Sequence, residues 1–181
     1  GATLDWDKPG SAWEQLKPEA RKNIRGLEAQ LWSETIKGRN MIEYYMLPKL
    51  IGFAESAWSP ERKWETEPNH DLRVKSIDAG WNRFANTIAQ KEFPVLAKMN
   101  GGYAYRVPPA GAVVENGMIK ANTALPGISI HYTTDGSEPT MDSPVYEAPV
   151  PATATIRFKT FDATGRAGRT VTVQGSVQRL N

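Results

Sequence analysis

The spacing of apolar residues changes at Asn100–Gly102, and this change constrains the fold of the 181-residue chain more than any other feature. Before this point, apolar residues recur every three or four positions, which is typical of amphipathic helices. After it, apolar and polar residues alternate in short runs separated by proline and glycine, which is typical of strands and turns. The sequence therefore predicts an α+β chain with two domains, a mostly helical one over residues 1–102 and a small β-sandwich over residues 103–181.

Two long helices are predicted in the first domain. An apolar stretch runs from about Asn40 to Trp58, and because it is apolar around most of its circumference we expect it to be covered on more than one side. Pro48 lies inside this stretch and should kink the helix. A second helix begins near Asp71, which can cap it, and Pro94 ends or restarts it. Its apolar stripe consists of Val74, Ile77, Trp81, Phe84 and Ile88.

The start of the chain and the second domain have weaker patterns. Residues 1–17 lack a clear period and are predicted to form a loop, and Pro18 then opens a short helical turn. In the second domain, Asp135–Gly136 and Thr164–Gly165 are the most evident turns. The alternating runs that predict strands are Ile128–Tyr132, Thr155–Lys159 and Thr170–Gln174.

The nine residues from Gly26 to Glu34 have two faces of opposite character when they are read with a period of two, which predicts a strand over about residues 26–33. One face holds Leu27, Ala29 and Leu31, and the other holds Glu28, Gln30, Trp32 and Glu34. A sugar ring has apolar C–H faces that an indole can cover and hydroxyls that carboxylates and amides can bind. The polar face therefore predicts the wall of a sugar-binding site.

Several motifs in series resemble one enzyme family. Lys22–Glu34 is followed by Tyr44–Leu50 and by Ala54–Pro60, and this order and spacing resemble the last strand and helix of the catalytic barrel in glycoside hydrolase family 20, the β-N-acetylhexosaminidases. Further along, Tyr105–Pro109 and His131–Thr140 resemble the small β-domain that follows this barrel in many of these enzymes. The resemblance, over about residues 20–175, implies the last strand and helices of a (β/α)8 barrel followed by an immunoglobulin- or fibronectin-like β-sandwich. A whole barrel needs roughly 200–250 residues, so this chain cannot contain one.

The family resemblance also implies a reaction. In this family the acetamido carbonyl of the substrate attacks the anomeric carbon, an Asp orients the acetamide, and an adjacent Glu protonates the leaving oxygen. None of the seven aspartates here is followed by Glu, and the His-x-Gly-Gly motif that precedes the pair is absent from the sequence. We therefore expect a C-terminal fragment of a retaining, substrate-assisted β-N-acetylhexosaminidase that has no catalytic residue of its own and is inactive alone.

The same resemblance assigns two substrate-binding residues. Trp32 matches the tryptophan that stacks on the terminal sugar, and Glu34 matches the carboxylate that receives its O4 and O6 hydroxyls; the alternative for Trp32 is a core position against a helix. Glu28 and Gln30 are predicted to be structural, because a barrel interior is filled by packed side chains. For Glu55 we expect a structural partner.

Composition excludes several other classes of protein. A net charge of +2 without a long basic run argues against nucleic acid binding, and the apolar stretches are too short for a membrane span. The absence of cysteine removes disulfides and thiolate sites. His70 and His131 have no second ligand at metal spacing, so we expect neither a metal nor another cofactor. A secreted or periplasmic location is implied only by the resemblance.

Two classes of function remain open. The chain belongs to an enzyme that removes terminal N-acetylhexosamine from glycans, or it is a non-catalytic module whose β-sandwich binds a glycan or a protein. In either case we expect the β-domain to fold as a unit. Because a parallel strand pairs on both edges, we also expect the chain either to self-associate through residues 26–33 and the first long helix or to lose that strand.

Overall fold

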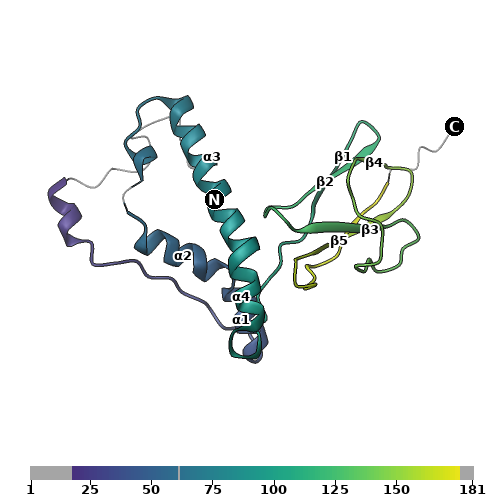
Figure 1. The fold of residues 1–181 in the computed structure, drawn as a ribbon, viewed down its shortest axis with the longest axis horizontal. Coiled ribbons are helices and arrows are strands. Elements are labelled where there is room, and N and C mark those ends of the chain that lie inside the picture. Colours follow the sequence, from purple (N-terminus) through teal and green to yellow (C-terminus); the bar gives the residue numbers. More distant parts are fainter. Residues whose placement is uncertain (1–17, 61, 176–181) are drawn as a thin grey trace.

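Helices form the first part of the chain and two small sheets form the second (Figure 1). The computed structural model describes residues 18–60 and 62–175, so the predicted loop over residues 1–17 lies outside the described residues. The α-helices are α1 (Arg39–Met46), α2 (Lys49–Trp58), α3 (His70–Thr87) and α4 (Phe93–Lys98). Shorter helical turns cover Pro18–Asn23, Lys63–Glu65, Ile88–Glu92 and Met99–Gly101.

The predicted strand over residues 26–33 is not formed, and that prediction is wrong for this chain. Residues 24–33 have no regular secondary structure, and all of residues 22–35 are exposed. A parallel strand needs a neighbouring strand and covering helices, whereas all strands of the described residues lie after residue 110 and none pairs with this stretch. The loss of the strand is one of the two outcomes that the sequence led us to expect.

Pro48 separates two helices where one kinked helix was predicted. The backbone N–H of Leu47 closes α1 by donating to the carbonyl of Glu43 (2.8 Å), and the N–H of Ile51 donates to the carbonyl of Pro48 (2.9 Å) to begin α2. Proline has no N–H and its ring displaces the preceding turn, so the break follows from local chemistry. No residue of α2 is fully buried, in contrast to the cover expected on several sides.

The second predicted helix is present but begins earlier than expected. Its cap is Asn69, not Asp71, because the Asn69 Oδ1 accepts a hydrogen bond from the N–H of Leu72 (3.0 Å). Pro94 restarts the helix, since it lies in the first turn of α4 and the chain reaches it from α3 through the single turn Ile88–Glu92. The apolar stripe is buried only towards its end, where Ile88 is 4% exposed while Trp81 is 51% exposed.

Two antiparallel sheets of three strands make up the second part. The first has the order β1 (Gly111–Glu115), β2 (Met118–Asn122), β4 (Val150–Pro151), and the second has the order β3 (Ser129–Thr133), β5 (Ile156–Phe161), β6 (Val171–Val173). The three alternating runs of the sequence correspond to β3, β5 and β6. Both sheets contribute to one cluster of buried residues, whose members are Ala110, Ile119, Ile130, Ala152, Ile156 and Phe158.

The hairpin of β1 and β2 was not predicted, although the sequence contains its signal. Asn116 and Gly117 join the two strands with φ angles of 51° and 74°. A two-residue hairpin turn with positive φ at both positions favours Asn-Gly, since Asn tolerates this conformation and Gly adopts it freely. Asn116–Gly117 is therefore a hairpin signal of the same kind as Asp135–Gly136, which was named from the sequence.

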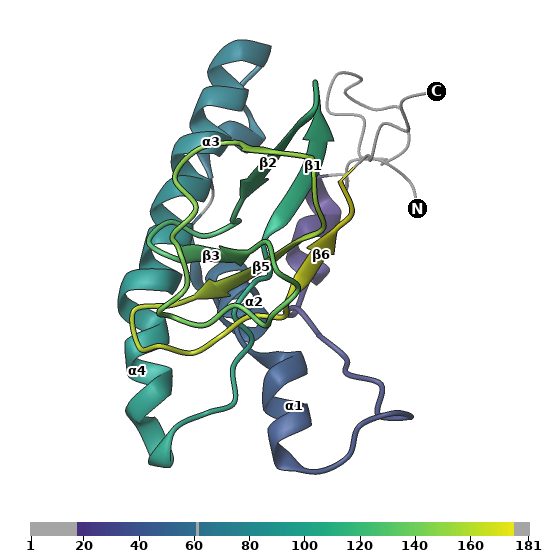
Figure 2. The same cartoon turned by 90° about the vertical axis from the view of Figure 1, so that its right-hand side faces the viewer.

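A second cluster of buried residues joins the helices to the sheets, which stand beside α3 and α4 (Figure 2). The rings of Phe93 in α4 and Tyr105 are stacked with their centroids 4.6 Å apart. The Tyr105 hydroxyl also donates to the carboxylate of buried Asp162 at 2.5 Å. Other members of this cluster are Ala85, Ile88, Ala89, Leu96, Val107, Leu125 and Ile128. The helices and the β part are therefore packed through a common core.

Candidate functional site

Trp32 and Glu34 lie at the end of the extended stretch that precedes α1. A turn begins at Ser33, whose carbonyl accepts from the N–H of Ile36 at 3.0 Å. The Trp32 side chain is 74% exposed, and Glu34 is exposed as well. The structure thus places both side chains at the surface, and it places Trp32 away from a core position.

The two residues predicted to be structural lie beside each other on the same stretch. Gln30 Nε2 donates to Glu28 Oε1 at 3.0 Å, although both residues are exposed. This contact between positions i and i+2 agrees with the period of two that separated the polar face from the apolar one. Glu28 and Gln30 therefore lie on the same side of the stretch although it is not paired with another strand.

A groove of about 940 Å³ lies between α2, the turn Lys63–Glu65 and α3. Its apolar lining includes Leu50, Ile51, Ala54, Trp58, Trp64 and Phe84. Gly80 allows the indole of Trp64 to lie against α3, because a Cβ atom at Gly80 would be 2.8 Å from Trp64 Cζ3. The Arg62 guanidinium lies 5.5 Å above the centre of the Trp64 ring. Sequence reasoning missed this groove, since it joins residues that are distant along the chain.

Glu55 at the edge of this groove has the structural partner that we expected. Its Oε1 accepts from the Ser59 hydroxyl at 2.8 Å, and its carbonyl accepts from the Ser59 N–H at 3.0 Å. The carboxylate is exposed, not buried. Glu55 therefore fixes the end of α2.

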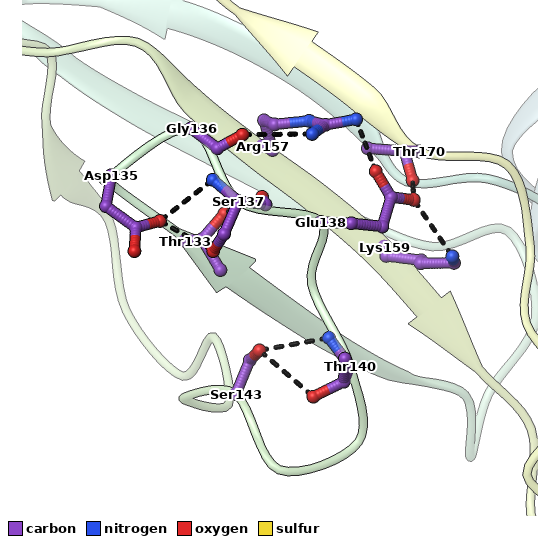
Figure 3. Close-up of polar contacts among 10 residues, drawn as sticks. All are labelled: Thr133, Asp135, Gly136, Ser137, Glu138, Thr140, Ser143, Arg157, Lys159 and Thr170. Carbon is purple, nitrogen blue, oxygen red and sulfur yellow. Dashed lines mark hydrogen bonds and ion pairs between the residues drawn. The ribbon is translucent and has the colours of Figure 1, made fainter.

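The Asp135–Gly136 turn predicted in the β part is present, and it is held by its aspartate. Asp135 Oδ1 accepts from the N–H of Ser137 (2.9 Å) and from its hydroxyl (2.6 Å), as Figure 3 shows. These hydrogen bonds, the hydroxyl first, lower the pKa of Asp135 because they stabilise its charged form. Gly136 has a φ of 81°, which a residue with a side chain rarely adopts.

Glu138, just after this turn, accepts from three side chains, two on β5 and one just before β6 (Figure 3). Lys159 Nζ lies 2.9 Å from its Oε1, and Arg157 and Thr170 donate to it as well. Hydrogen bonds from Thr170 and then Lys159 lower the pKa of Glu138. Arg157 and Lys159 alternate with buried residues along β5, so the sequence contained a signal for this cluster that was not used.

His131 uses both ring nitrogens in the packing of the β part. Nδ1 is 2.8 Å from the carbonyl of Ser143, Nε2 is 3.1 Å from the Ser129 hydroxyl, and the ring meets Phe161 edge to face. Within residues 18–60 and 62–175, His, Asp and Glu side chains form no group of three that could hold a metal ion. No helix in these same ranges is long and apolar enough to cross a membrane.

Comparison with known proteins gives two family matches in series. Residues 1–61 match the family described as glycosyl hydrolase family 20, catalytic domain. Residues 92–170 match the chitobiase/beta-hexosaminidase C-terminal domain. The second match begins in the helical turn that precedes α4, so it includes Phe93 of the common core as well as β1 to β5, and it ends just before β6.

Individual relatives match over most of this chain but over a small part of their own length. A beta-hexosaminidase of Vibrio vulnificus is 29% identical over 95% of this chain and 22% of the relative. The N,N'-diacetylchitobiase of Vibrio harveyi is 34% identical over 72% of this chain and 15% of the relative. A beta-hexosaminidase of Porphyromonas gingivalis is 23% identical over 84% of this chain and 18% of the relative. The chain is therefore similar first to part of the catalytic domain of glycosyl hydrolase family 20 and then to the chitobiase/beta-hexosaminidase C-terminal domain.

Proposed function

We propose that this chain supplies part of the catalytic domain, and the domain that follows it, of a retaining, substrate-assisted β-N-acetylhexosaminidase that removes terminal N-acetylhexosamine from glycans. The observation that carries this proposal is the order of the two family matches, which is the order of domains in such an enzyme. The names of the relatives from the two Vibrio species agree with it. The family resemblance favours a secreted or periplasmic location for the whole enzyme.

Residues 1–102 then belong to a (β/α)8 barrel and residues 103–181 form an immunoglobulin- or fibronectin-like β-sandwich. In favour of the sandwich, both sheets contribute to one buried cluster that includes Ile119, Ile130 and Phe158. In favour of the barrel, the sequence of 26–33 has one apolar and one polar face, and Gln30 Nε2 contacts Glu28 Oε1 on the polar one. Paired between two strands, its polar face would point to the interior of the barrel.

In that setting, Trp32 stacks on the terminal sugar and Glu34 accepts hydrogen bonds from its hydroxyls. An indole covers the C–H face of a pyranose, and a carboxylate binds hydroxyls in charge-assisted hydrogen bonds. The acid and the acetamide-orienting aspartate must come from outside these 181 residues, since the sequence contains no Asp-Glu pair.

Two assays test the proposal together. The isolated chain, incubated with a chromogenic N-acetyl-β-glucosaminide, should give only the buffer rate, because proton transfer needs the absent pair. Turnover that persists after repurification would contradict this. A chimera in which this chain replaces the aligned region of the Vibrio harveyi chitobiase should hydrolyse the same substrate. If that chimera has a cooperative thermal transition but no turnover, the proposal is wrong.

A further inference from the structure

Helix α1 follows the two residues that we assign to sugar binding, and local contacts connect it to them. The turn that begins at Ser33 closes with a hydrogen bond from the Ile36 N–H (3.0 Å). The next N–H, that of Lys37, donates to Met41 Sδ in the first turn of α1 (3.2 Å). The position of α1 therefore determines where the backbone of the two assigned residues lies.

Glu43 is the buried residue of α1, with 9% of its surface exposed. Its Oε2 accepts from the backbone N–H of Ala104 (2.8 Å), and its Oε1 accepts from the Arg39 guanidinium. The hydrogen bond from Ala104 first, and then that from Arg39, holds the pKa of the Glu43 carboxyl below its usual range, so the group is charged at neutral pH. Glu43 lies in the region that matches the catalytic domain, while Ala104 lies in the region that matches the C-terminal domain. This contact therefore joins the two matched regions.

The stretch that contacts α1, Tyr103–Arg106, is held on both sides. The N–H of Arg106 donates to the carbonyl of Leu47 at the end of α1 (3.0 Å), so the helix is fixed at a second point. On the other side, the Tyr105 hydroxyl donates to the carboxylate of buried Asp162 in the β part (2.5 Å). Hydrogen bonds through this stretch therefore connect the β part to α1.

We propose that Glu43 is a positioning residue for the sugar site: by binding the Ala104 N–H, it fixes α1 on the C-terminal region and thereby sets where Trp32 and Glu34 meet the terminal sugar. The inference rests on the proposed function, in which those two residues bind the sugar. Its support is the set of contacts between α1 and residues 103–106, which do not involve the stretch 26–34. A side chain without an acceptor at position 43 would leave the Ala104 N–H unpaired, and an unpaired N–H costs free energy where water is excluded.

Three substitutions separate the acceptor from the bulk of the side chain. Glu43→Leu keeps a similar size but offers no acceptor to the Ala104 N–H. Glu43→Gln keeps one side-chain oxygen for this N–H, and Arg39 can turn to water because its side chain is already 66% exposed. Glu147→Leu, at an exposed position in the β part, is the control for replacing a glutamate by leucine. Of the three, only Glu43→Leu should displace α1.

Kinetics in the chimera with the Vibrio harveyi chitobiase test the effect on the sugar site. Glu43→Leu should lower kcat/KM for a chromogenic N-acetyl-β-glucosaminide by roughly 10- to 100-fold, since a misplacement of about 1 Å can cost about 100-fold. Glu43→Gln and Glu147→Leu should leave kcat/KM nearly unchanged. In a Trp32→Ala background the loss caused by Glu43→Leu should be smaller, because both changes act on the same contact with the sugar.

The outcomes of these assays separate the inference from the proposed function. An unchanged kcat/KM in Glu43→Leu would overturn the inference. Equal losses from Glu43→Leu in the two backgrounds, or equal losses in Glu43→Leu and Glu43→Gln, would show a merely structural role and would overturn it as well. An unmodified chimera that folds but has no turnover would contradict the proposed function itself, and the inference would fall with it.

Amide hydrogen exchange in the 181-residue chain tests the contact between Glu43 and Ala104 without any activity. Peptides that cover residues 36–47 should exchange about 10-fold faster in Glu43→Leu than in the unmodified chain, the scale of one lost buried hydrogen bond. Glu43→Gln and Glu147→Leu should not change this exchange. If Glu43→Leu does not fold, Glu43→Asp replaces it, because its carboxylate is one methylene too short to reach the Ala104 N–H. Equal exchange in the substituted and unmodified chains would overturn the proposal.

Discussion

Short polar side chains fix the ends and turns of this chain through backbone N–H groups. Asn69 caps α3, Asp135 closes one turn, and Asp162 Oδ1 accepts from the backbone of both Thr164 (2.8 Å) and Arg166 (3.0 Å) to close another. Aspartate and asparagine suit these places because their side chains are just long enough to reach a backbone group two to four residues ahead. A sequence therefore shows such positions well, but it does not show which of two neighbours caps a helix, as the choice of Asn69 over Asp71 illustrates.

The Glu138 cluster predicts a dependence of stability on pH. The hydrogen bonds from Thr170 and Lys159 lower the pKa of Glu138 in the folded state below the value of 4.5 for a free glutamate. A carboxyl group whose pKa is lowered by folding stabilises the fold at pH values above its pKa in the unfolded chain. This contribution is lost as the pH falls through its pKa in the folded state. Between about pH 5 and pH 3, the free energy of unfolding should therefore fall less for Glu138→Gln than for the unmodified chain. Glu147→Gln, at an exposed position, is the control, and an equal change in both variants would contradict the prediction.

Strands were predictable where a buried face imposes alternation and unpredictable where it does not. In β5 the pattern of burial alternates over Ile156–Lys159, and the sequence identified it. In β1 most side chains are exposed, so no alternation was visible, and only Asn116–Gly117 indicated a hairpin. The stretch 26–33 has the pattern of a strand but no neighbour to pair with. The groove could not be predicted at all, because it depends on how α2 lies against α3.

The β1–β2 turn predicts a local cost of substitution. Gly117→Ala should lower the free energy of unfolding by about 1 kcal/mol, because an alanine at a φ of 74° is strained while no atom lies within 4 Å of the added Cβ. Gly26→Ala is the matched control, since its Cβ also meets nothing within 4 Å and its φ is not in the positive range. Denaturant unfolding measures both variants. An equal effect at the two positions would mean that the turn is not formed as described.

At the scale of the whole molecule, the common core connects the helices to the β part. Phe93 is fully buried against Tyr105, and the matched C-terminal family region starts at residue 92. We therefore expect residues 69–175 to unfold at a higher temperature than residues 103–175, because the shorter segment exposes Tyr105 and Val107. Phe93→Ala should cost about 3–5 kcal/mol in the longer segment. Equal transition temperatures for the two segments would show that the β part does not need the helices.

The assignment of the sugar-binding residues came from a family resemblance and a polar face, and the fold of this chain alone leaves both residues at the surface. The roles that we propose for Trp32 and Glu34 require the stretch 26–33 to be paired between strands, and none of the described strands pairs with it. Packing and turns follow from the residues present, whereas a barrel wall depends on its neighbours. The two family matches therefore cover most of the chain, while the proposed site needs neighbours that the described residues do not supply.

The most direct measurement is the kinetics of Trp32→Ala in the chimera with the Vibrio harveyi chitobiase. The account predicts that the loss of the indole weakens kcat/KM for a chromogenic N-acetyl-β-glucosaminide by the equivalent of about 1–3 kcal/mol, with an unchanged thermal transition. Met141→Ala, far from Trp32 in the sequence, should leave both quantities unchanged. An unchanged kcat/KM in Trp32→Ala would contradict the assignment of Trp32 to the sugar. So would a loss of kcat/KM that is accompanied by a lowered thermal transition.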